Sequence, residues 1–188
     1  MSPGARALTR VIAVVAAVGV GFVLLQSHFR IFETAFSVGL LHFLGATGVA
    51  SPQGVDALVT PSGHGAFYVE LTPSCSALPA ILAIIALSVA MVPARANRPR
   101  WYLGAAAAIV VVFMGNVLRI DGSIGVGLLL GRVSLVLFHD WVGSAFGFAS
   151  VVGSWILLLW IQLPKGRGSG LPTTADRQSR AVDHLPVA

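Results

Sequence analysis

The sequence predicts an all-α integral membrane protein: a multi-pass helical bundle that carries a short β-hairpin outside the membrane. Of its 188 residues, 56% are hydrophobic and only 10% are charged, whereas about 25% of the residues in a soluble domain are charged. The apolar residues form long runs, and most charged residues lie in the short segments between them. Basic loops of this kind are typical of membrane proteins, so the formal net charge of +5 indicates no nucleic-acid partner.

The first predicted crossing lies near the N-terminus. Residues 11–25 are uninterrupted apolar sequence after Arg6 and Arg10, and the run can be counted from residue 8 to residue 26. Its length approaches the roughly 20 residues that a helix needs to cross a bilayer. No Ala-x-Ala cleavage site follows, which favours an uncleaved anchor over a signal peptide.

The next segment fits a helix at the membrane surface as well as it fits a span. In residues 27–49 the large apolar side chains recur at helical spacing, but Arg30, Glu33 and His42 interrupt them. We therefore predict an interfacial or re-entrant helix at about residues 31–50. Residues 51–72 alternate apolar and polar side chains around a Pro-Ser-Gly-His-Gly turn, which predicts the extracytoplasmic β-hairpin.

Three further apolar runs predict crossings, at residues 77–92, 101–118 and 141–163. The loop at 93–100 is densely basic. The glycine-rich segment 122–138 contains Arg132, which is costly at mid-bilayer, so we predict a second interfacial or re-entrant helix there. Residues 1–163 are thus expected to form one membrane-embedded domain, and 164–188 a disordered basic tail.

Four crossings place both termini and the 93–100 loop in the cytoplasm, as the positive-inside rule requires. The same topology brings Cys75, Arg119 and His139 to the outer face of the membrane, where we expect them to converge. Thr72, Pro73 and Ser74 resemble a helix start, which predicts Cys75 in the first turn of the helix that follows. Unpaired amides and the helix dipole would favour the reactive thiolate there.

Several neighbouring residues support this cluster. Asn116 is three residues before Arg119, so the two share a helix face. Gly143 is four residues after His139, and its missing side chain would let another helix or a substrate backbone approach the imidazole. Asp140 is predicted to be the N-cap of the last helix. No Cys or His residues show metal-ligand spacing, so we expect neither a metal nor a cofactor.

These motifs together resemble the exosortase/archaeosortase family. The matching stretches are Cys75-Ser76 after a hairpin, Asn116-Val117-Leu118-Arg119-Ile120 at a helix end, His139-x-x-x-Gly143, and an earlier Arg30-x-x-Glu33 followed by Leu44-Gly45. The resemblance covers about residues 28–160. One difference is Ala77, which stands where the family usually has glycine after Cys-Ser.

The resemblance implies a membrane cysteine protease or transpeptidase that cleaves C-terminal sorting signals of exported proteins. Cys75 would be the nucleophile, His139 the general base and Arg119 the stabiliser of negative charge, and Ser74, Asn116, Asp140 and Gly143 would support them. The substrates of such an enzyme would carry a short motif, a transmembrane helix and a basic tail. The enzyme would bind them in the lipid bilayer.

Two other readings compete with an enzyme. A non-enzymatic membrane scaffold or assembly partner of a surface-protein export system would need none of this chemistry. Taken alone, a single cysteine is most simply a small packing residue. A transporter would need ionisable residues inside its spans, and the runs 77–92, 101–118 and 141–163 contain none between their ends.

Overall fold

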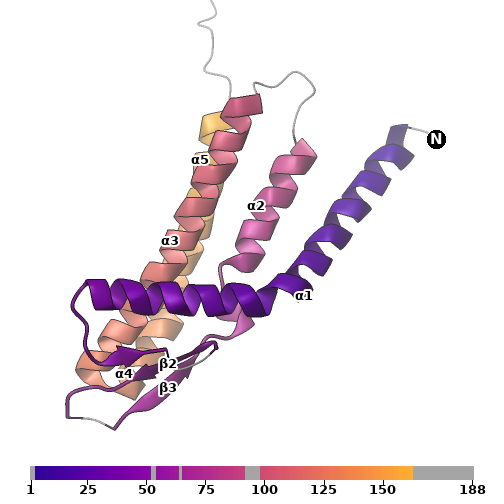
Figure 1. Ribbon diagram of the computed structural model, residues 1–188. Helices are drawn as coiled ribbons and strands as arrows, with labels where there is room; N and C mark the ends of the chain where they lie inside the picture. The colour runs from indigo at the N-terminus through magenta and orange to yellow at the C-terminus, as the bar shows by residue number, and fades with distance from the viewer. Residues whose placement is uncertain (1–2, 52–53, 64, 92–97, 163–188) are drawn as a thin grey trace, which may run out of the picture.

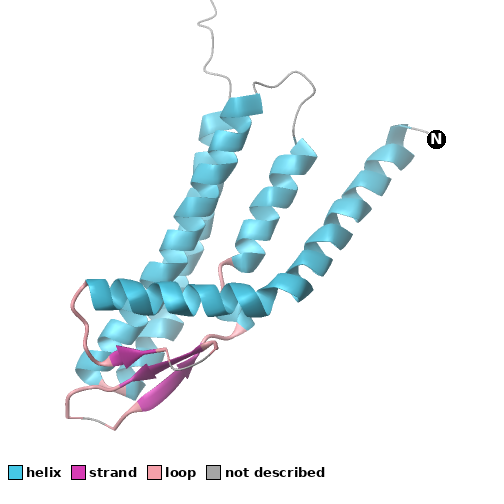
Figure 2. Cartoon of the chain, viewed as in Figure 1, coloured by secondary structure: helices cyan, strands magenta, loops and turns pink. Residues whose placement is uncertain are grey.

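The protein is mostly helical, with one small antiparallel sheet (Figures 1 and 2). The computed structural model describes residues 3–51, 54–63, 65–91 and 98–162; the tail 164–188 and most of the 93–100 loop lie outside them. The elements, in chain order, are α1 (Pro3–Phe43), β1 (Val49–Ala50), β2 (Asp56–Val59), β3 (Phe67–Glu70), the 3₁₀ turn η1 (Pro73–Cys75), α2 (Leu78–Met91), α3 (Arg98–Leu130), α4 (Arg132–Leu137), the π-helical turn η2 (Phe138–Gly143) and α5 (Ser144–Gln162).

The bundle consists of the N-terminal part of α1 together with α2, α3 and α5, which run side by side (Figure 1). Within the described part of the chain, three stretches are long and apolar enough to cross a membrane: Val11–Phe43, Trp101–Leu130 and Arg132–Ile161. Leu78–Val89 in α2 is a shorter apolar helix. A multi-pass helical protein is therefore supported by the length and composition of its helices.

Part of the predicted interfacial helix is not a separate element. The segment after residue 26 continues α1 as far as Phe43, and Figure 1 shows this second part of α1 turning to run across the other helices. Phe32 and Phe43 face outward, being 52% and 86% exposed, whereas Glu33 and Ser37 are buried on the same side of the helix as Val38 and Leu41. A helix with large aromatic side chains on its outward face suits a position at the membrane surface.

The second predicted interfacial segment, 122–138, is divided between two elements. Helix α3 does not end near Arg119 but continues to Leu130. Ile120 and Ile124 explain this extension, because both are buried against the sheet and α1. The chain then reverses at Gly131, whose φ of 83° suits glycine, and returns through α4, η2 and α5.

The predicted hairpin is confirmed, and a third strand joins it. β2 and β3 pair antiparallel with Val59 opposite Phe67, and β1 pairs with the other edge of β2. One face of the sheet packs on α1 and α3, where Ala57 and Val59 are completely buried. We call the sheet, the second part of α1, the end of α3 after Arg119, α4 and η2 the cap.

Candidate active site

Cys75 does not lie in the first turn of a long helix, contrary to the sequence prediction. It ends the short turn η1, Ser76 is extended, and α2 begins only at Leu78. Pro79 accounts for this start, because proline fits the first turn of a helix, where its missing N–H is not needed. The Leu78 N–H donates to Ser76 Oγ at 3.2 Å. The dipole of α2 therefore does not act on Cys75 as the sequence suggested.

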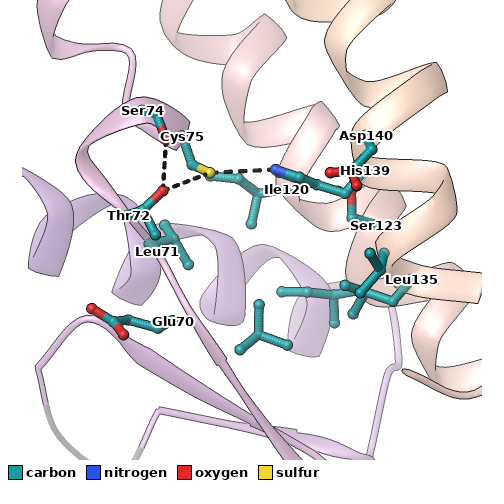
Figure 3. A pocket seen from close by; sticks show the side chains of 13 residues that line it. Glu70, Leu71, Thr72, Ser74, Cys75, Ile120, Ser123, Leu135, His139 and Asp140 are labelled. Carbon is teal, nitrogen blue, oxygen red and sulfur yellow. Dashed lines mark hydrogen bonds between the residues drawn. The ribbon is translucent and has the colours of Figure 1, made fainter. Parts of the chain in front are cut away.

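Instead, a histidine from another element meets the cysteine. Cys75 Sγ lies 3.3 Å from His139 Nε2, and Figure 3 shows the two side chains pointing toward each other. Arg119 Nη2 lies 3.3 Å from the same His139 nitrogen. The structure thus brings together the three side chains that the order of the helix ends predicted to converge.

Ser123 determines which nitrogen of His139 carries the proton. Its hydroxyl donates to the Arg119 carbonyl at 2.8 Å, and its oxygen lies 3.3 Å from His139 Nδ1. A hydroxyl that has given its hydrogen to a carbonyl accepts from the ring, so we assign the neutral imidazole proton to Nδ1. The lone pair on Nε2 then faces the Cys75 thiol, as a general base requires.

The surroundings of Cys75 favour its thiolate. The hydrogen bond with His139 lowers the pKa of Cys75 to about 7, and smaller contributions in the same direction come from Thr72 and from the charge of Arg119. Partial burial of the sulfur opposes this change. Thr72 Oγ1 lies 3.2 Å from the sulfur and 2.8 Å from Ser74 Oγ. The hydroxyl of Ser74, a predicted site residue, is thus linked to the sulfur through Thr72 Oγ1.

A buried carboxylate supports the cysteine loop from behind. Glu33 is completely buried, and its Oε1 accepts the Ala77 N–H and Asn116 Nδ2, each at 2.9 Å. Asn116 Nδ2 also donates to the Cys75 carbonyl at 2.8 Å. These bonds connect α1 and α3 to the backbone at Cys75 and just after it. Asn116 therefore does support the site, through the backbone of the cysteine.

The glycines of η2 and α5 make room for the arginine rather than for a substrate. A methyl group at Gly143 would lie 3.3 Å from both Cγ and Nε of Arg119, and one at Gly147 would lie 3.4 Å from its Nη1. Asp140 is not the N-cap of the last helix, because it lies inside the π-helical turn η2. Its exposed side chain lines the pocket beside His139.

Two pockets lie next to the reactive groups. The larger, of about 350 Å³, extends from Cys75 and His139 between β3 and α4, with α3 behind it (Figure 3). Its walls are mainly apolar and include Leu71, Ile124 and Leu135. The smaller, of about 200 Å³, lies on the bundle side and is lined by Arg119, Asn116 and small residues of α2 and α5.

Ser123 was missed in the sequence, Thr72 was considered only as part of a helix start, and Glu33 was noted only as part of a motif. Ser123 lies one helical turn after Arg119, and that spacing is the one signal that could have found it. His42, which lacked ligand spacing, bonds the Val49 carbonyl at 2.6 Å and so joins α1 to the sheet. Among the described residues no cluster of His, Cys, Asp or Glu could hold a metal ion.

Comparison with known proteins found no matching family model, no similar curated protein and no similar solved structure.

Proposed function

We propose that this protein is a cysteine peptidase or transpeptidase of the cytoplasmic membrane that cleaves C-terminal sorting signals of exported proteins. The observation that carries the proposal is the 3.3 Å approach of Cys75 Sγ to His139 Nε2, with Arg119 on the same nitrogen and a pocket beside them. A nucleophile, a base and an oriented third group are the parts that acyl transfer by a cysteine needs.

The chemistry follows from the geometry. His139 Nε2 takes the thiol proton, and the Cys75 thiolate attacks the scissile carbonyl carbon to form a C–S bond. His139 then returns the proton to the leaving amine as the C–N bond breaks, which leaves a thioester. Water or an acceptor nucleophile attacks the thioester and regenerates the thiol. Arg119 carries a permanent charge and stabilises the oxyanion of each tetrahedral intermediate.

The distribution of charge supports an outward-facing site. We count the shorter apolar helix α2 as a crossing beside the three longer stretches. With four crossings, both termini and the basic loop between α2 and α3 lie in the cytoplasm. The cap and Cys75 then lie at the outer leaflet, and the second part of α1 lies along its surface. A client held in the same membrane by its own C-terminal helix would present the preceding segment at this height.

Comparison of protein C-termini in cells tests the function. The native gene is replaced by Cys75→Ala, Arg119→Ala or His139→Ala, and Ser134→Ala, on α4 outside both pockets, is the matched control. We expect exported proteins that end in a transmembrane helix and a basic cluster to remain uncleaved in the three site variants, and to be cleaved in the control. Normal cleavage in Cys75→Ala would contradict an enzyme and favour the scaffold.

Sidedness is tested separately with a membrane-impermeant maleimide. Cys75 is the only cysteine in the sequence, so any labelling of the chain reports on it alone. We expect labelling in intact cells or spheroplasts. Labelling that requires lysis would place the thiol in the cytoplasm and overturn the proposed topology.

A further inference from the structure

β3 is an edge strand whose outer backbone groups can be identified from the hydrogen bonds of its inner side. The Leu71 N–H donates to the Val55 carbonyl at 3.1 Å, so these two residues form a hydrogen-bonded pair. Such pairs alternate along antiparallel strands. The pairs Val69 with Ala57 and Phe67 with Val59 therefore bond in the same way. The backbone N–H and C=O groups of Tyr68 and Glu70 consequently point away from β2.

The hydrogen bonds between β2 and β1 agree with this alternation of hydrogen-bonded pairs. The Thr60 N–H donates to the Gly48 carbonyl at 2.7 Å, which assigns Thr60 and every second residue before it to β1. Val59 and Ala57 are then left to bond β3, in agreement with the first assignment. No described strand pairs with the outer edge of β3.

This open edge adjoins the larger pocket. Val69 and Glu70 of β3 line it on one side and Leu135 and Val136 of α4 on the other, and the chain of β3 leads directly to Cys75 (Figure 3). A segment lying in this pocket along β3 would therefore end at the sulfur. The apolar residues of α3 and α4 in the pocket wall suit one apolar side chain at every second position of such a segment.

We propose that the client segment preceding the cleavage site binds as an added β-strand along the outer edge of β3. This inference rests on the proposed function and names how its substrate is recognised. Backbone bonds to Tyr68 and Glu70 supply affinity without regard to sequence, and the pocket selects alternate apolar side chains. The added strand runs parallel to β3, because the exported part of the client lies on the cap side and its C-terminal helix on the bundle side. The smaller pocket beside Arg119 lies on that second side.

A second copy of this chain is a less suitable occupant. The Glu70 carboxylate lies 3.6 Å from Arg30 Nη2 but is 66% exposed at this edge, and two edges that pair with each other would bring two such carboxylates together. A client strand has no such restriction. Pairing between copies is nevertheless one outcome that the experiment below detects.

Photo-crosslinking tests the added strand. In Cys75→Ala cells, which retain uncleaved precursors, p-benzoylphenylalanine replaces Val136 in the pocket wall or Val133, which is 73% exposed on the same helix outside the pocket. We expect position 136, and not position 133, to crosslink a precursor, which mass spectrometry identifies by its C-terminal helix and basic cluster. Equal yields at both positions, or crosslinking to a second copy of this chain, would overturn the proposal.

Proline at position 70 then tests the backbone bonds. Glu70→Pro removes an outward N–H that β2 does not use, whereas Glu70→Ala removes the same carboxylate but keeps the N–H. We expect the crosslink at position 136 to fall roughly five- to tenfold in Glu70→Pro and to persist in Glu70→Ala. An undiminished crosslink in Glu70→Pro would show that binding does not use the strand edge.

Iodoacetamide labelling of Cys75 in otherwise wild-type protein checks the fold of the proline variant. Should Glu70→Pro disturb this labelling, the pair Tyr68→Pro and Tyr68→Ala, farther from Cys75 along the chain, decides by the same criterion. The two proposals fail differently. Absence of precursors in Cys75→Ala cells refutes the peptidase, whereas precursors that crosslink regardless of proline refute only the added strand.

Discussion

The bundle and the cap have different interiors. In the bundle, α2, α3 and α5 meet through apolar side chains such as Ile84, Ala108 and Leu158, which are at most 1% exposed. Where the cap meets α3, polar groups are buried beside apolar ones, and Glu33 and Ser123 hold the cysteine loop and the imidazole by hydrogen bonds. Apolar packing tolerates small shifts, but a hydrogen-bonded site does not. The apolar bundle therefore supports the site, and the hydrogen bonds at the cap hold the Cys75 thiol in position.

The largest expected effect follows from removing the base. In His139→Ala the hydrogen bond that lowers the pKa of Cys75 is lost, so the pKa rises from about 7 toward its ordinary value of 9.0. The thiolate forms as pH rises through the pKa, so the midpoint of the pH profile for iodoacetamide alkylation should move upward. Client cleavage should fall by at least about 100-fold. An unchanged midpoint would mean that His139 does not act on the sulfur.

A smaller loss is expected from the buried carboxylate. Glu33→Ala removes the acceptor of the Ala77 N–H and of one Asn116 bond, and leaving buried donors unpaired costs about 1–3 kcal/mol. We expect roughly tenfold slower cleavage and a lower melting temperature in detergent. Glu33→Gln keeps an oxygen at this position and should restore most of the rate. Equal defects in both variants would point to the charge of Glu33 rather than to its hydrogen bonds.

A third variant sharpens the role of the arginine. Gly143→Ala places a methyl group 3.3 Å from Cγ and Nε of Arg119, so the arginine side chain must move slightly from its position beside His139. We expect cleavage to slow by less than it does in Glu33→Ala, with little change in stability. Gly153→Ala, on the same returning helix, meets nothing within 4 Å and should cleave normally. If the two alanine variants behave alike, the position of Arg119 does not limit the reaction.

The smallest effect on the site is expected from the bundle itself. Leu158→Ala leaves a cavity in the bundle core and should lower the free energy of unfolding by about 2–5 kcal/mol. The alkylation midpoint of Cys75 should stay near 7, because no group that contacts the sulfur has changed. A shifted midpoint would show that the bundle and the site are coupled more tightly than the comparison of their interiors indicates.

Much of the fold and of the candidate site could be predicted from the sequence. Long apolar runs separated by basic loops predicted the helices, and alternation around a glycine turn predicted the β2 and β3 hairpin. Cys75, Arg119 and His139 were chosen because each lies beside an apolar run. The continuation of α3 past Arg119 was missed, because the glycine-rich sequence there weakens the helical pattern while packing against the sheet stabilises the helix.

Sequence alone thus determined that this chain is an apolar, multi-helical protein with a single thiol between a hairpin and a helix. It did so because hydrophobic periodicity and charge are local properties. His139, 64 residues away, was already predicted to converge with this thiol, but only the tertiary structure showed that its Nε2 lies 3.3 Å from the sulfur and that Cys75 lies outside α2. The hydrogen bonds that Glu33 accepts behind the cysteine loop and the pocket beside β3 were likewise found only in the tertiary structure. These features depend on distances between segments far apart in the chain, and such distances are set by packing.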